Sequence, residues 1–271
     1  MLDIVSAGES ELASFETICD GSLFDLKGVL PSEMLFLCAI VRELEADSVV
    51  ESGRARGVST ALISSFFANS DIDIYSIENT KYSLDSKIAE SRLKDCKNLR
   101  LLYGDAFVRL PRIVQRLKAP VVFIDGPKGE KAVFLCAYLL KEFENIKAVL
   151  IHDCYRGSAE RSLISTFLPN AISSDDPSFV NSFKHLDTAC WEKVHTLGDV
   201  STAPYIQNGK AVESYGHTIS AIINDDSTHM QCDNLFKELN VDARDFDIGF
   251  FGGLLREVKT YLPRRSYFQM I

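Results

Sequence analysis

Four side chains that can move a proton follow two apolar runs of the chain. Asp125 ends the run at residues 120–125, and Asp153 directly follows the run at 147–152. If the two runs are neighbouring parallel strands, these carboxylates lie about 5 Å apart at one sheet edge and can converge on one cation or one acceptor group. Lys128, three residues after Asp125, and His152, directly before Asp153, are further candidate bases.

His152 is the less direct candidate of the two bases. Side chains alternate between the two faces of a strand, so the sequence predicts that His152 and Asp153 point in opposite directions. A histidine in a strand more often makes a structural bond than a catalytic one. We therefore predict Asp125, Lys128 and Asp153 as catalytic residues, with His152 as the alternative base.

A glycine loop lies between an apolar strand and a helix-forming run at residues 48–60. Gly53 and Gly57 bracket the turn, and Ala55 stands where a strict dinucleotide motif carries its second glycine. Glycine allows positive φ and a close backbone approach, and a helix N-terminus offers free N–H groups. A ligand is therefore expected on this loop, and the glycine pattern alone leaves a dinucleotide as one option.

Two acidic residues favour another ligand over a dinucleotide. Glu51, two residues before Gly53, could meet a cationic group and would repel a pyrophosphate. Glu78 ends the next strand, where doubly wound folds place the residue that bonds ribose hydroxyls. A ligand with an ammonium group and a ribose fits both acids, and S-adenosylmethionine is such a ligand.

With these motifs the chain resembles the class I S-adenosylmethionine-dependent methyltransferases over residues 32–160. The resemblance rests on the loop from Glu51 to Gly57, on Glu78, and on Asp105 after Gly104. It implies a Rossmann-like α/β fold with a doubly wound, mostly parallel sheet, an antiparallel strand pair at its C-terminal end and helices on both faces. The cofactor-binding residues that it implies are Glu51, Gly53, Arg54, Ala55, Gly57, Ser59, Glu78, Asn79, Asp105, Ala106 and Asp125.

Within that family, Asp125 followed three residues later by Lys128 resembles the catechol and caffeoyl-CoA type of O-methyltransferase. That resemblance implies that Asp125 and Asp153 bind Mg²⁺ and that Lys128 takes the hydroxyl proton. A divalent ion beside Lys128 would lower the lysine pKa and make it a usable base. The metal-binding branch has asparagine after the second acid, whereas this chain has Cys154, a soft ligand poorly matched to Mg²⁺.

Strands and helices alternate with short connections, which is typical of a parallel sheet. We predict strands at 48–51, 73–78, 99–103, 120–125 and 147–152, and helices at 31–44, 58–68, 82–95, 108–117, 130–143 and 161–167. Residues 169–182 are predicted to be a loop. The segments 191–197 and 217–223 are predicted to form the antiparallel strand pair.

The composition favours one large α/β domain. The 271 residues are 46% hydrophobic, and 29 basic against 38 acidic residues give a net charge of −9, which argues against nucleic acid or an anionic membrane as partner. Seven cysteines without paired spacing, and no signal-like N-terminus or membrane-length apolar run, predict a cytoplasmic protein with reduced thiols.

Three regions complete the expected organisation. Residues 1–30 are predicted to form a helical cover, residues 31–224 the cofactor-binding domain, and residues 225–271 an extension that packs on the domain or on a second subunit, as in a homodimer. The predicted function is methylation of a hydroxyl on a small molecule. Methylation of nitrogen or of a sugar hydroxyl without a metal, and a non-catalytic protein of the same fold, are the alternatives.

Overall fold

A computed structural model describes residues 2–19, 23, 25, 28–196, 206–207, 210–211 and 217–238. Its main sheet has seven strands in the order β3-β2-β1-β4-β5-β9-β6, and β7 and β8 form a separate two-stranded ribbon. The strands are β1 (Ser48–Ser52), β2 (Asp73–Glu78), β3 (Leu99–Tyr103), β4 (Pro120–Ile124), β5 (Ala148–Ile151), β6 (Ile172–Ser173), β7 (Ile206–Gln207), β8 (Lys210–Ala211) and β9 (Ser220–Ile223).

Strands β1 to β5 run parallel, and β9 pairs antiparallel with both β5 and β6. The order reverses at β1, whose neighbours are β2 on one side and β4 on the other. In open α/β sheets this switch point, at the carboxyl edge, is where ligands bind. The predicted Rossmann-like, mostly parallel sheet with an antiparallel pair is confirmed.

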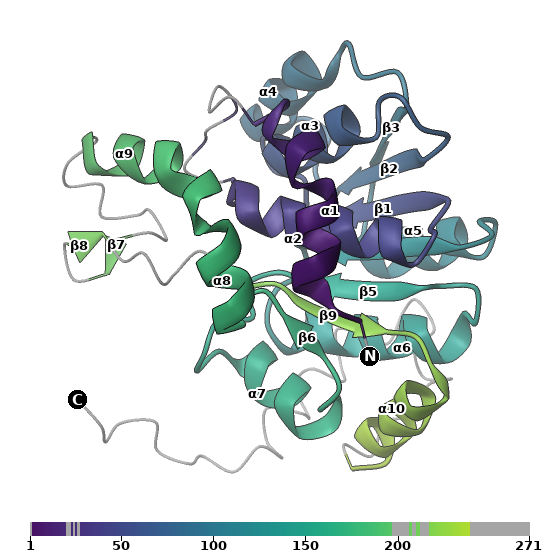
Figure 1. The fold of residues 1–271 in the computed structure, drawn as a ribbon. Coiled ribbons are helices and arrows are strands. Elements are labelled where there is room, and N and C mark those ends of the chain that lie inside the picture. The colour runs from purple at the N-terminus through teal and green to yellow at the C-terminus, as the bar shows by residue number, and fades with distance from the viewer. Residues whose placement is uncertain are drawn as a thin grey trace.

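Helices cover both faces of the sheet (Figure 1). The helices are α1 (Ile4–Glu16), α2 (Pro31–Glu43), α3 (Val58–Phe66), α4 (Leu84–Leu93), α5 (Ala106–Val114), α6 (Glu130–Glu142), α7 (Ala159–Phe167), α8 (Pro177–Phe183), the 3₁₀ helix η1 (Lys184–Asp187), α9 (Thr188–Thr196) and α10 (Asp226–Glu238). Helices α1, α2, α3 and α8 share one hydrophobic core, and α5, α6, α7 and α10 share the other.

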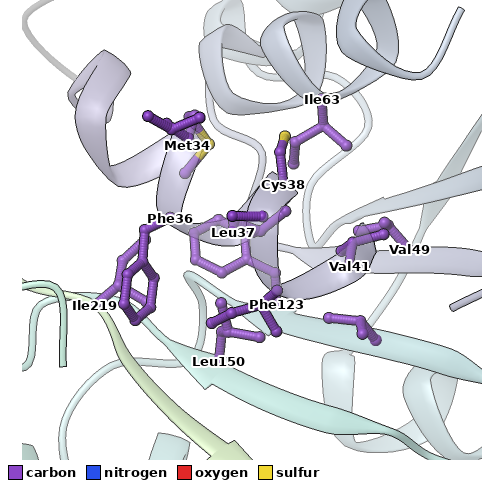
Figure 2. Close-up of a cluster of buried hydrophobic side chains, with 14 of the residues drawn as sticks. Met34, Phe36, Leu37, Cys38, Val41, Val49, Ile63, Phe123, Leu150 and Ile219 are labelled. Atoms are coloured by element: carbon purple, nitrogen blue, oxygen red, sulfur yellow. The ribbon is translucent and has the colours of Figure 1, made fainter. Parts of the chain in front are cut away.

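The alternation of side chains along the central strands separates these two cores. Val49 of β1 lies in the core with α2, and the next residue, Val50, lies in the opposite core. Figure 2 shows side chains of α2 beside Phe123 of β4 and Leu150 of β5. Every residue of α2 from 31 to 41 is buried, as expected for a helix that is enclosed by other elements on all sides.

One predicted element has the wrong type. Residues 191–197 were predicted to be a strand, but residues 188–196 form α9. The partner of β9 is instead β6, in the segment 169–182 that was predicted to be a loop and that also contains α8. The strand propensity of a segment is a weak preference that depends on its pairing with neighbouring strands, and the surrounding structure can override it.

The N-terminal segment contains α1, which packs against α2. The predicted tail from Phe246 onward lies outside the described residues, and so does most of the connection between 198 and 216. No helix within the described residues combines the length and the apolar character needed to cross a lipid bilayer.

A buried carboxyl group on η1 holds the N-terminus of α2. Asp187 accepts hydrogen bonds from the backbone N–H of Ser32 at 2.9 Å and from the Ser32 hydroxyl at 2.6 Å. The same hydroxyl lies 3.1 Å from Nε2 of His217. Burial raises the pKa of Asp187 to about 7, so the folded chain holds a proton here that the unfolded chain releases near pH 4.

This linkage predicts that stability falls as the pH rises from about 4 to about 7. The stabilisation that comes from the raised pKa of Asp187 is fully present below the pKa of the unfolded chain and is lost above the pKa of the folded chain. Its upper bound is about 4 kcal/mol, at 1.36 kcal/mol per pKa unit. Asp187→Asn removes the titration, so its free energy of unfolding, from urea denaturation at several pH values, should vary less than that of the wild type. Equal pH dependence in both proteins would assign the effect to another group.

Candidate functional site

The loop after β1 contains three residues with positive φ. Gly53 has φ 88°, Ala55 has φ 45° and Gly57 has φ 77°. A Cβ atom at Gly53 would lie 2.6 Å from the backbone nitrogen of Gly126 and 2.7 Å from the carbonyl carbon of Asp125. Glycine at position 53 therefore allows the loop after β1 to touch the loop after β4 directly.

Glu51 lies beneath this loop and is fully buried. Its carboxylate accepts hydrogen bonds from the hydroxyls of Ser59, Thr60 and Ser76, the last at 2.6 Å. Burial raises its pKa. Glu51 and Ser59 were both predicted to contact the cofactor, but in this arrangement they brace the start of α3 from below.

The two arginines of the loop also make internal contacts. The buried side chain of Arg54 donates from Nη1 to the carbonyl oxygens of Ser76 and Leu102, at 2.6 and 3.2 Å, while Nε and Nη2 have no hydrogen-bond partner among the described residues. Arg56 pairs with Asp85 at 2.8 Å and with Asp25 at 3.3 Å. These contacts tie the loop to β2, β3, α4 and the segment before α2.

A pocket of about 220 Å³ opens at the carboxyl ends of β1 to β4. It contains five of the predicted cofactor residues: Gly53, Glu78, Asn79, Asp105 and Ala106. Glu51, Arg54, Ala55, Gly57, Ser59 and Asp125 do not line it. Sequence reasoning missed Ser52, Ile77, Gly104, Phe107, Gly126, Pro127 and Lys131, and most of these directly flank strand-end residues that it found.

The two acids of the pocket are held by backbone N–H groups. Glu78 accepts from the N–H of Ala55 at 3.0 Å and from that of Asn79 at 2.8 Å. Asp105 caps α5 and accepts from the N–H of Phe107 at 2.8 Å. A carboxylate has about four acceptor positions, so Glu78 keeps capacity for two ribose hydroxyls. The pocket thus presents carboxylate oxygens that can accept hydrogen bonds from a ligand.

Beyond the pocket, the predicted catalytic side chains form one cluster. Nδ1 of His152 lies 2.5 Å from Oδ1 of Asp125 and 3.5 Å from Oδ1 of Asp153. The Lys128 amine pairs with Oδ2 of Asp153 at 2.6 Å and with Asp125. Two carboxylates and two cationic groups therefore meet between the ends of β4 and β5.

The prediction that His152 and Asp153 point in opposite directions is wrong. Strand β5 ends at Ile151, so neither residue follows strand alternation. Asp153 adopts a left-handed conformation with φ 64°, which aspartate tolerates better than most side chains. This turn brings the carboxylate of Asp153 back toward His152.

The electrostatics of the cluster differ from those expected for a lysine base. Burial by itself lowers the pKa of Lys128, but the carboxylates of Asp125 and Asp153 outweigh it and raise the pKa. His152 behaves in the same way, because Asp125 and Glu33 raise its pKa well above the ordinary value despite burial. Although burial opposes it, the pKa of Asp125 is lowered by His152 and Lys128. Both shifts favour the protonated forms of Lys128 and His152.

Asp125, His152 and Asp153 each offer one ligand atom, and these atoms lie within 4.8 Å of one another. The third potential ligand is therefore His152, which precedes Asp153, and Cys154 is not one of the three. The Cys154 thiol is buried, its pKa is raised by burial to about 12, and it donates to the carbonyl oxygen of His152 at 3.9 Å. A protonated buried thiol does not bind a hard cation.

Neither models of protein families nor curated proteins gave a match to this chain. Among solved structures, it is similar to an O-methyltransferase from Bacillus cereus in complex with SAH, at 18% identity over 80% of this chain and 90% of that chain, with a TM-score of 0.43. It is also similar to the O-methyltransferase TomG from Streptomyces achromogenes in complex with SAM, at 18% identity over 83% and 91%, with a TM-score of 0.43. Similarity of this degree identifies neither the cofactor nor the substrate of this chain.

Proposed function

We propose that this chain is an S-adenosylmethionine-dependent methyltransferase that methylates a hydroxyl group of a small molecule. The observation that carries the proposal is the contact between two loops. The loop after β1 and Glu78 both line the pocket, and the loop after β4 carries Asp125. The two loops touch at Gly53 and Gly126. A nucleoside-sized pocket thus lies directly beside an acid–base cluster.

S-adenosylmethionine would supply a methyl group on a sulfonium, which an electron-rich oxygen displaces. In this chain Asp125 and Asp153 would accept the hydroxyl proton, because the raised pKa values of Lys128 and His152 favour the protonated forms of those two side chains. The Lys128 amine, with a side chain 48% exposed, stabilises the developing oxyanion. Carboxylates are weak bases, so this arrangement favours an acidic hydroxyl such as a phenol over a sugar hydroxyl.

The proposal predicts that the purified protein binds S-adenosylhomocysteine and does not bind NAD. The pocket offers carboxylates of Glu78 and Asp105, which bond ribose and repel a pyrophosphate. Isothermal titration calorimetry with each ligand checks this. Binding of NAD without a response to S-adenosylhomocysteine would overturn the proposed cofactor. A screen of phenols, amines and sugars with methyl-labelled cofactor then identifies the acceptor class.

A divalent ion is a further part of the proposal. Asp125 and Asp153 would hold it together with His152, whose Nδ1 would release its proton on binding, and the ion would lower the pKa of an acceptor hydroxyl. The two carboxylates suit Mg²⁺, while the imidazole suits Mn²⁺ or Zn²⁺ better. His152 also pairs directly with Asp125 and Asp153. The cluster is therefore balanced in charge without a metal ion, and the proposed chemistry does not require one.

Chelation distinguishes these two cases. We expect EDTA to lower the rate only for acceptors with neighbouring oxygens, because such acceptors complete the coordination of a metal ion. Initial rates with and without EDTA, for a vicinal diol and for a matched monohydroxyl compound, test this expectation. Full activity toward the diol in EDTA would remove the metal from the proposal and leave the carboxylates as bases. The cytoplasmic location and the homodimer stay predictions.

A further inference from the structure

Glu33 is a buried carboxylate at the start of α2 that no sequence motif indicated. Its side chain is 2% exposed. Oε2 accepts from the N–H of Leu30 at 3.1 Å, which forms one half of a helix cap. Oε1 accepts from the N–H and the hydroxyl of Thr218, at 2.7 and 2.9 Å. These three bonds account for a structural role and fix the position of the carboxylate.

The same carboxylate also faces the acid–base cluster. Nε2 of His152 lies 3.5 Å from Oε2 of Glu33, while Nδ1 on the other side of the ring lies 2.5 Å from Asp125. The ring of Phe123 packs against the imidazole at a centroid distance of 6.2 Å and an angle of 61°. The imidazole is therefore held between two carboxylates, one of which belongs to the cluster and one of which does not.

We propose that Glu33 is a positioning residue for the reaction, which keeps the His152 ring oriented with Nδ1 toward Asp125. This inference rests on the proposed function. An imidazole without a partner at Nε2 can turn about its χ2 bond, and a carboxylate at that nitrogen fixes both its orientation and the site of its proton. The requirement is the same whether Nδ1 donates to Asp125 or binds a metal ion, since histidine ligands commonly donate their other N–H to a carboxylate.

Glu33→Gln tests the proposal, with Ser32→Ala as the matched control. Glutamine keeps the size of Glu33 but loses its charge and one acceptor oxygen. Ser32 begins the same helix turn and contacts Asp187 and His217 rather than His152, so its loss weakens the helix start without removing a contact to His152. We expect Glu33→Gln to lower kcat about 10- to 100-fold, with the acceptor KM changed by less than about 3-fold, and Ser32→Ala to lower stability without lowering kcat. A kcat of wild-type size in Glu33→Gln would overturn the proposal.

A spectroscopic measurement on the wild type supports the test even if Glu33→Gln fails to fold. Long-range ¹H–¹⁵N NMR spectra at one pH assign the protons on the two nitrogens of the His152 ring. We expect a protonated Nε2 whose proton exchanges slowly with water, because the carboxylate of Glu33 lies 3.5 Å from this nitrogen in a buried position. An unprotonated or freely exchanging Nε2 contradicts the proposal. This readout needs no turnover, so it is independent of whether S-adenosylhomocysteine binds.

Discussion

Asp125→Asn is expected to abolish methyl transfer while S-adenosylhomocysteine still binds. Asp125 contacts both Lys128 and His152, and an amide of the same shape can neither accept a proton nor balance these cations. Losing such an acid–base group typically costs about 100- to 10,000-fold in rate. Initial rates with labelled cofactor measure the loss of turnover. The affinity for S-adenosylhomocysteine should be retained because Asp125 does not line the pocket, and calorimetry measures it.

The control for this variant is an ion pair of similar geometry far from the cluster. Lys141 and Asp233 lie 2.6 Å apart between α6 and α10, so Asp233→Asn removes a comparable charge without touching the site. Its kcat should match that of the wild type. If Asp125→Asn retains full activity with an acceptor that the wild type methylates, the cluster is not the reaction site.

Glu78→Ala is expected to weaken S-adenosylhomocysteine binding by about 1.5–3 kcal/mol, or about 10- to 150-fold, if each charge-assisted bond to a ribose hydroxyl contributes its usual amount. The structure adds a second reason for the loss. Glu78 holds the N–H groups of Ala55 and Asn79, so the variant also releases the glycine loop. Dissociation constants from calorimetry give the size of the effect.

The other end of the same strand provides the control. Asp73 begins β2 and pairs with Arg100 at 3.4 Å, in an exposed position at the opposite edge of the sheet. Asp73→Ala should bind S-adenosylhomocysteine as tightly as the wild type. Equal affinities for Glu78→Ala and wild type would place the ribose elsewhere in the fold.

Local signals predicted the parts of the fold in which one short segment decides the structure. Gly53 and Gly57 indicated the turn after β1, and both have positive φ in the structure. The acids Glu78 and Asp105 were found because Glu78 ends β2 and Asp105 lies two residues beyond the end of β3. Residue type and position relative to a strand end were sufficient in each case.

Other features depend on contacts between distant segments, which no local pattern contains. From its place in the sequence Glu51 was predicted to contact a ligand, whereas the structure shows that its carboxylate accepts from Ser59, Thr60 and Ser76, the last of which lies on another strand. Glu33 and His152 are far apart in the chain and meet through the packing of α2 on the sheet. The orientation of Asp153 was predicted wrongly because the strand was expected to continue through His152, whereas β5 ends at Ile151.

The contact between Gly53 and Gly126 has a consequence for engineering new acceptor preferences. The backbones of the two loops are in direct contact, so a side chain at position 53 would push against the backbone of Asp125 and displace it. Under the proposed function, the distance between the cofactor pocket and Asp125 is therefore set by a backbone contact, and mutational libraries gain nothing by varying Gly53.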